Sequence, residues 1–304
     1  MPEGHSIHRL SRAFDELFGG QRLSASSPQG RFTRGAEILD GLKLTASEAF
    51  GKQLFLGFGG AAKEPAHWLR VHLGLYGAWT FAGDRNFHGP HAIGAPRRRV
   101  GEEEKALPPD ATVGPSGGQT DPPDSADERF VPPAPRGAVR LRLLGDHGCA
   151  DLNGPTACEV ITETEMAGVL ARLGPDPLRS DSDPERFIQK SRARRVAIGS
   201  LLMDQAVLAG VGNIYRAESL FRAGVDPYTP GSKLPGDVLN SIWQDLRVLM
   251  ADGVAQGKIV IRPDPEEPFF VYRRTGMGCF VCGSPIAEAK LQARRLFWCP
   301  GCQS

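Results

Sequence analysis

Long apolar runs are missing from this sequence. No stretch of its 304 residues approaches the ~20 apolar residues that a membrane-spanning helix requires. The first residues, MPEGHSIHRLSR, also lack the apolar core of a secretory signal peptide. We therefore expect a cytoplasmic protein with no membrane partner.

Net charge is almost absent as well, at +1, which is unusual for a protein that binds nucleic acid. The charge is unevenly spread, however, because residues 101–130 hold eight acidic and two basic residues, and the rest of the chain carries +7. A modestly basic body is compatible with phosphate binding. Proline, glycine and acidic residues dominate residues 84–137, so we expect a disordered insertion there.

The apolar pattern predicts an α+β protein. Ile7, Leu10, Phe14 and Leu17 have helical spacing and predict an amphipathic helix over 5–18. Short strand-like runs separated by glycines follow from about 22 to 82, and another strand is expected at 138–145, which together indicate a β-sandwich or barrel. Helices are predicted within 184–223, around a glycine-rich turn, and over 236–251.

Cysteine is scarce, and its spacing is specific. Sixteen residues separate two Cys-x2-Cys pairs: Cys279, Cys282, Cys299 and Cys302. This pattern is typical of a zinc ribbon with four thiolate ligands, and the alternative is a pair of local disulfides or free thiols. Four protein ligands leave no position for a reacting water, so we expect one structural Zn²⁺ per chain. Cys149 and Cys158 are interpreted as buried apolar residues.

The segment between the two cysteine pairs, AEAKLQARRLFW, is basic. A metal-pinned hairpin with Lys290, Arg294 and Arg295 near its tip is suited to a DNA groove. A solvated basic turn explains these residues equally well.

A glycine-rich turn, LAGVGN, precedes one predicted helix. Gly210 and Gly212 would let the backbone approach a ligand closely, and Asn213 is expected to cap the helix, whose free amides suit a phosphate oxygen. An ordinary corner between two helices is the alternative.

The N-terminus offers a nucleophile. Methionine before proline is readily removed, so loss of Met1 would expose the secondary amine of Pro2, whose pKa starts near ~8. A secondary amine that attacks a sugar C1′ forms a cationic iminium, which is an electron sink for elimination of the 3′ phosphate. Glu3 is a candidate proton donor if its pKa is raised. A frayed terminus is the alternative for these residues taken alone.

Taken together, these segments resemble one family, the bifunctional formamidopyrimidine-DNA glycosylases and endonuclease VIII. The resemblance covers the chain except for residues 84–137, and its pieces occur in the family's order. They are PEGHSIHRL at the start, GKQLFL at 51–56, HLGLYG at 72–77, GVGNIYRAESLFRAGVDP at 210–227, FFVYRRTGMGC at 269–279 and WCPGCQ at the end.

The resemblance implies three domains. Residues 1–145 would form a catalytic β-sandwich domain flanked by helices and interrupted by the insertion. Residues 146–265 would form a helical DNA-binding domain with a helix-two-turn-helix motif, and residues 266–304 a β-hairpin zinc finger. The implied partner is damaged DNA, bound by a monomer at the bacterial nucleoid.

The resemblance also implies catalytic roles. Pro2 resembles the Schiff-base nucleophile and Glu3 the general acid of the family. Lys52 resembles the lysine that contacts phosphate and aids catalysis. Arg294 resembles the zinc-finger arginine that grips the strand beside the reacting nucleotide.

Further residues resemble the family's DNA contacts. Asn213 resembles the turn asparagine that holds phosphates around the lesion. Leu75, with Tyr76 beside it, resembles the wedge that fills the gap left by an extruded base, whose rotation out of the stack costs a few kcal/mol.

The branch of the family is indicated by PEG at the start and LYG at 75–77, which resemble endonuclease VIII. That branch removes oxidised pyrimidines and finishes by β,δ-elimination. His5 departs from the usual proline, and PEGHSIHR is similar to an actinobacterial subgroup. The alternatives are a glycosylase specific for 8-oxoguanine and formamidopyrimidine, or a zinc-ribbon DNA-binding protein without catalysis. The N-terminal PE and the β-rich first half argue against a third alternative, an RNA-binding protein.

Overall fold

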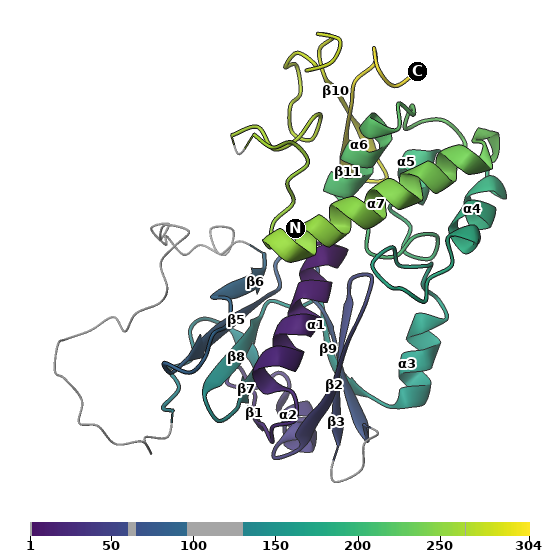
Figure 1. The fold of residues 1–304 in the computed structure, drawn as a ribbon. Coiled ribbons are helices and arrows are strands. Elements are labelled where there is room, and N and C mark those ends of the chain that lie inside the picture. Colours follow the sequence, from purple (N-terminus) through teal and green to yellow (C-terminus); the bar gives the residue numbers. More distant parts are fainter. Residues whose placement is uncertain (1, 60–64, 96–129, 265) are drawn as a thin grey trace. The chain divides into compact units, whose positions relative to one another are not determined.

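The computed structural model describes residues 2–59, 65–95, 130–264 and 266–304 (Figure 1). The chain forms two compact units. The first contains residues 1–2, 10–48 and 54–163, and the second contains residues 3–9, 49–53 and 164–304. Among the described residues, no helix has the length and apolar character needed to cross a membrane.

Helix α1 (Gly4–Phe18) confirms the amphipathic helix predicted over 5–18. Ile7, Leu10 and Phe14 are buried, whereas Leu17 is only half-buried. Within the first unit, Phe14 packs edge-on against Trp79 with ring centroids 4.8 Å apart. The Ser11 hydroxyl donates to the carbonyl of Ser47, so the helix contacts a strand of each sheet.

The described strands of the first unit form two β-sheets, which fits the sandwich among the two predicted arrangements, a β-sandwich or a barrel (Figure 1). A five-stranded sheet has the order β1-β7-β8-β5-β6, and a four-stranded sheet has the order β2-β3-β4-β9. The strands are β1 (Ser24–Ser26), β2 (Lys43–Phe50), β3 (Gln53–Gly59), β4 (His67–His72), β5 (Ala78–Gly83), β6 (Ala92–Gly94), β7 (Val139–Leu144), β8 (Gly148–Asn153) and β9 (Ala157–Ile161). Strand β3 is a continuous apolar run and is buried over most of its length, as expected for a strand covered on both faces.

The structure differs from two predicted boundaries. The domain limit expected at residue 145 falls between β7 and β8, which pair with each other, and the first unit continues to Glu163. The disordered insertion expected over 84–137 is wrong for residues 92–94, because β6 pairs with β5 there. Residues 96–129 of that expected insertion lie outside the described residues, whereas residues 130–137 are described.

Two short helices were not predicted. Helix α2 (Thr33–Leu39) has seven residues and buries only Ala36 and Leu39, which is too few to form a periodic pattern. Helix α3 (Glu163–Leu170) likewise buries only Met166 and Val169.

The second unit is helical, with α4 (Pro184–Arg192), α5 (Ile198–Leu201), α6 (Asn213–Arg222), the short helix η2 (Gly231–Lys233) and α7 (Gly236–Gln256). Its core gathers Tyr215 of α6 with Trp243, Leu246 and Met250 of α7. These helices confirm the prediction for 184–223, and α7 extends five residues beyond the expected end at 251.

A β-hairpin lies between the two cysteine pairs. Strands β10 (Ala287–Leu291) and β11 (Arg294–Trp298) pair antiparallel and are joined by Gln292 and Ala293. Both joining residues have positive φ, of 49° and 60°, as a two-residue hairpin turn with the twist of the strands requires. The hairpin and the cysteines share a small core with Ala217 and Phe221 of α6, so α6 supports both the helical core and the finger.

Candidate active site and metal centre

The carboxylate of Glu3 lies at the N-terminus of α6. One oxygen accepts from the amide of Ile214 at 2.9 Å, and the other accepts from Gly212 at 2.9 Å and Tyr215 at 3.4 Å. The side chain is fully buried. These amides are the ones that a helix leaves without partners in its first turn, so the carboxylate satisfies them.

The predicted capping role of Asn213 is wrong. Gly212 is the N-cap residue, and no side chain of α6 caps the helix. Because Glu3 already binds the amides of Gly212, Ile214 and Tyr215, these three amides are not open to a phosphate oxygen. The Asn213 side chain is used elsewhere, since its Nδ2 donates to the carbonyl of Arg295 at 2.9 Å and its Oδ1 accepts from Arg216.

Lys52 belongs to the same site. Its ammonium donates to the carbonyl of Val211 at 2.7 Å, one residue before Gly212. Burial lowers the pKa of Lys52, the Glu3 carboxylate opposes this, and the nearby guanidinium of Arg294 lowers it further. The structure therefore brings Glu3, Lys52 and the 210–213 turn together, with Arg294 within electrostatic reach.

Burial also dominates the state of Glu3. Removal from water raises the pKa of this carboxyl above its ordinary value, while Lys52 and the three backbone donors oppose the rise. A carboxyl with a raised pKa retains its proton at higher pH and is suited to donate it.

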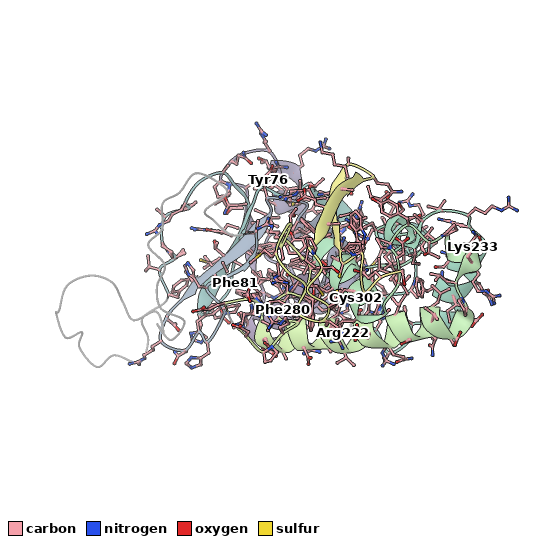
Figure 2. All side chains as sticks on the ribbon, turned by 90° about the horizontal axis from the view of Figure 1, so that it is seen from above. Tyr76, Phe81, Arg222, Lys233, Phe280 and Cys302 are labelled. Carbon is pink, nitrogen blue, oxygen red and sulfur yellow. The ribbon has the colours of Figure 1, made fainter. Side chains whose placement is uncertain are left out.

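The remaining predicted residues lie in the first unit. Pro2 is buried and directly precedes Glu3 in the chain. Leu75 and Tyr76 form the turn between β4 and β5, where they are 36% and 58% exposed, and Tyr76 is labelled in Figure 2. The predicted removal of Met1 concerns a residue outside the described part of the chain.

The basic residues of the hairpin have different surroundings. Arg294 and Lys290 are exposed, as the hypothesis of a DNA-binding tip requires. Arg295 instead forms a bidentate ion pair with Glu288, with distances of 2.6 and 2.5 Å. The charge of Arg295 is therefore offset by Glu288 within the hairpin.

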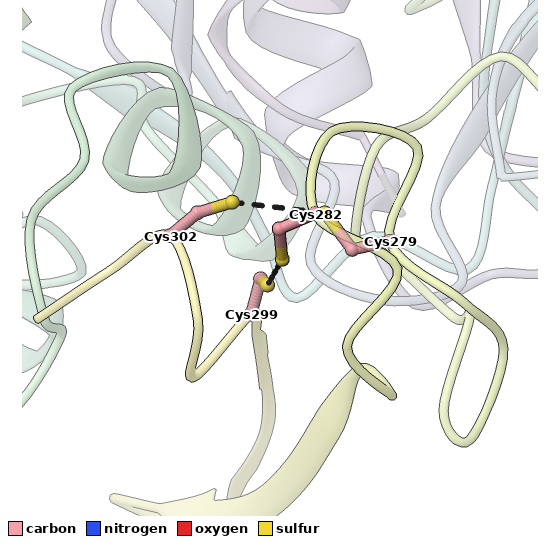
Figure 3. A group of neighbouring side chains, drawn as sticks. All are labelled: Cys279, Cys282, Cys299 and Cys302. Atoms are coloured by element: carbon pink, nitrogen blue, oxygen red, sulfur yellow. Dashed lines mark hydrogen bonds between the residues drawn. The ribbon is translucent and has the colours of Figure 1, made fainter.

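Four cysteine sulfurs meet at one point in the finger (Figure 3). All lie within 4.8 Å of one another, with 3.8 Å between Cys279 and Cys302 and 3.4 Å between Cys282 and Cys299. A tetrahedral zinc with Zn–S bonds of about 2.3 Å requires sulfurs about 3.8 Å apart. The four thiols are therefore placed to bind one metal ion, and they fit zinc.

The other two cysteines are partly as predicted. Cys149 is buried, and burial raises the pKa of its thiol to about 11. Cys158 is only half-buried, which corrects the prediction, because β9 lies at the edge of the four-stranded sheet. Burial still raises the pKa of the Cys158 thiol to about 12, so neither is a reactive thiolate.

Two charged residues of α6 were missed by the sequence analysis. The guanidinium of Arg216 is fully buried and donates to the carbonyl of Arg295 at 2.9 Å. The carboxylate of Glu218 is fully buried and accepts from the amides of Phe270, Val271 and Tyr272. Both residues attach the finger segment to α6. The sequence signal that could have identified them is a charged residue on an otherwise apolar helix face.

Comparison with known proteins gives consistent matches. Residues 173–264 match the family model described as the formamidopyrimidine-DNA glycosylase H2TH domain. The whole chain is 41% identical to the protein named Endonuclease 8 1 of Mycobacterium tuberculosis, over 315 aligned residues that cover all of both chains. It is also 38% identical over 144 residues to the formamidopyrimidine-DNA glycosylase of Pseudomonas putida, which covers 44% of this chain and 53% of that one.

Solved structures share the fold. The structure of Lactococcus lactis Fpg with DNA containing an abasic site matches with a TM-score of 0.72, 20% identity and 99% coverage of both chains. A second Lactococcus lactis Fpg structure, with DNA containing N7-benzyl-Fapy-dG, has a TM-score of 0.71 and 20% identity over the full length of both chains.

Proposed function

Because the chain belongs to the formamidopyrimidine-DNA glycosylase and endonuclease VIII family, we propose that it is a bifunctional enzyme that removes oxidised bases from DNA and then cuts the strand. The observation that carries this proposal is the buried carboxyl of Glu3, directly after Pro2 and beside Lys52. A proton donor next to a potential N-terminal amine is the pair of groups that both reactions require.

The first step is attack by the Pro2 amine on C1′ of the damaged nucleotide. The bond between the Pro2 nitrogen and C1′ forms as the bond to the base breaks, and the nitrogen gives up its proton. The C1′–O4′ bond of the sugar ring then breaks, and Glu3 supplies the proton that the departing base or the ring oxygen needs. The product is an iminium between the Pro2 nitrogen and C1′. It requires that Pro2 be the mature first residue, so that its nitrogen is an amine and not an amide.

The second step is strand cleavage. The iminium draws electrons away from C2′, so loss of a C2′ proton expels the 3′ phosphate by β-elimination. A further elimination at the 5′ side completes β,δ-elimination, and hydrolysis of the iminium returns the free amine. Lys52, whose pKa is lowered by burial, lies beside Glu3 and is proposed to contact the phosphate of the reacting nucleotide.

DNA contacts are proposed for residues of both units. Arg294 at the hairpin tip is exposed and suited to a phosphate. One hydrogen of the Asn213 Nδ2 binds the carbonyl of Arg295, and the second is proposed to bind a phosphate oxygen. Leu75 and Tyr76, on an exposed turn, are proposed to fill the space of the extruded base.

The four cysteines are proposed to hold one structural Zn²⁺. The metal would supply no reacting group, because its four positions are filled by thiolates. It would fix the finger that carries Arg294. The named relative over the full chain is an endonuclease VIII, which supports a preference for oxidised pyrimidines over 8-oxoguanine.

Borohydride trapping tests the proposal directly. Protein whose intact mass shows loss of Met1 should form a covalent adduct with duplex DNA that carries an abasic site. The same chain with Met1 retained is the matched control and should form none through Pro2. No adduct from the Met1-free protein, with the DNA still bound, would favour the non-catalytic DNA-binding alternative. Excision rates on oxidised pyrimidines and on 8-oxoguanine then decide the branch.

A further inference from the structure

Asp176 lies in the segment between α3 and α4, and it is almost completely buried, with 3% exposure. Three donors share its carboxylate. Oδ2 accepts from the amide of Gly51 and pairs with Nε2 of His8, both at 2.7 Å, and Oδ1 accepts from the amide of Leu178 at 2.9 Å. Three separate chain segments thus meet at one carboxylate, all within the second unit.

The Gly51 end of this contact is tightly constrained. Gly51 has a φ of 58°, and a Cβ atom there would lie 2.8 Å from Cβ of Ala209 and 2.9 Å from the nitrogen of Gly210. The loop is thus pressed against the 209–210 backbone in a conformation that favours glycine. The residue before Gly51 is also held, because the guanidinium of Arg179 lies 3.8 Å from the centre of the Phe50 ring.

Lys52 follows Gly51 directly, so the hydrogen bond from the Gly51 amide to Asp176 holds the backbone one residue before the lysine. From there the ammonium reaches the carbonyl of Val211 at 2.7 Å, beside the Glu3 carboxylate. The segment with Asp176 also fixes the partner turn, since the carbonyl of Pro175 accepts from the amide of Ala209 at 3.0 Å. Asp176 therefore lies where the Lys52 loop and the 209–213 turn are held to each other.

We propose that Asp176, supported by His8, is a positioning residue that sets where the Lys52 ammonium lies relative to Glu3 and the reacting phosphate. It acts through the Gly51 amide and does not touch DNA itself. This inference rests on the proposed function, because it assigns a task to Lys52 within the glycosylase and lyase reactions.

Asparagine at position 176 is the informative change, since it preserves shape and removes one acceptor. Asn has one acceptor oxygen and one NH2 group, whereas the amides of Gly51 and Leu178 need an acceptor on each side. Either orientation therefore turns an NH2 group toward a backbone N–H. In one orientation the Gly51 amide loses its acceptor. In the other, residue 176 loses the bond to the Leu178 amide that fixes its side chain toward Gly51, so the position of Gly51 is disturbed in both.

The experiment uses Met1-free, full-length protein with DNA that carries a preformed abasic site. Asp176→Asn is expected to lower kcat for strand cleavage about 10- to 100-fold with KM changed less than about threefold, because misplacement of a catalytic group by ~1 Å costs up to about 10²-fold. The matched control is Asp183→Asn in the same segment. Asp183 caps α4 through the amide of Glu185, and asparagine caps equally well, so kcat should stay within about twofold.

A double variant separates positioning from general loss of structure. If Asp176 acts through Lys52, Asp176→Asn should cause no further loss of kcat in a Lys52→Ala background. If the losses of kcat caused by Asp176→Asn and Lys52→Ala multiply in the double variant, the inference is overturned. An unchanged kcat in Asp176→Asn alone also overturns it. Unreactive wild-type protein would instead overturn the proposed function, so the two failures are distinguishable.

His8→Leu gives a second route if Asp176→Asn does not fold. It removes one donor to Asp176 and leaves the Gly51 contact possible, so kcat should fall about 3- to 10-fold, less than the loss that ~1 Å of misplacement causes. This loss should also vanish in the Lys52→Ala background. Full activity, or a loss that persists without Lys52, contradicts the assignment.

Discussion

Gly212→Ala should separate base excision from strand cleavage. Gly212 is extended, with φ of −122°, so alanine suits the backbone itself. The added Cβ, however, would lie 2.4 Å from Cδ and 2.6 Å from Oε1 of Glu3. Ordinary contacts begin near 3.4 Å, so the carboxyl must move by about 1.0 Å.

That displacement sets the expected magnitudes. A shift of ~1 Å in a group that must deliver a proton is expected to lower the excision rate about 10²-fold. Loss of one or two of the amide contacts to Glu3 should cost about 2–3 kcal/mol of unfolding free energy, offset by about 0.4–1 kcal/mol from the less flexible unfolded chain. Cleavage at a preformed abasic site needs no proton for a departing base, so it should change less than about threefold.

Single-turnover rates on two duplexes test this, one with an oxidised pyrimidine and one with a preformed abasic site. Gly168→Ala is the control, because a Cβ there meets nothing within 4 Å, and both rates should match wild type. Equal loss of both activities in Gly212→Ala would mean that the turn, and not the Glu3 carboxyl, limits the reaction. Unchanged excision would refute the placement of Glu3 as proton donor.

Three further predictions follow from the same site. Glu3→Gln should abolish excision of an oxidised pyrimidine yet keep part of the cleavage at abasic sites, and unchanged excision would show that another group is the acid. Because burial raises the pKa of Glu3, the single-turnover excision rate should fall as pH rises through that folded-state pKa. The same shift lowers the unfolding free energy of the wild type once pH exceeds the ordinary value of 4.5, so the difference in unfolding free energy between wild type and Glu3→Gln should move in favour of Glu3→Gln as pH rises. A difference that is independent of pH in denaturation experiments contradicts the shift. Metal analysis should find one zinc per chain in the wild type and less than about a tenth of that in Cys302→Ser. The variant should bind DNA more weakly, while its first unit stays folded. Full metal content in Cys302→Ser would argue against binding by four thiolates.

Several features could be predicted from the sequence because they depend on local spacing. The helical periodicity of residues 5–18 sets α1, and the two Cys-x2-Cys pairs place four thiols on tight turns that converge. Short elements such as α2 and β6 escaped prediction, since a few buried residues carry no periodic signal. The limit at 145 failed for a related reason, because the pairing of β7 with β8 is a contact that spacing does not encode.

By itself, the sequence indicated the long helices, the four cysteines that lie close enough to bind one metal ion and the motifs of the candidate active site. Only the tertiary structure decided what each charge does. Three amides at the start of α6, expected to meet phosphate, instead bind the carboxylate of Glu3, which is 209 residues away from Gly212. Asp176, which the sequence did not single out, accepts from the amide of Gly51 in the loop that carries Lys52. The physical reason is that a buried polar group must find its partners wherever the fold brings them, and those partners are distant in the chain.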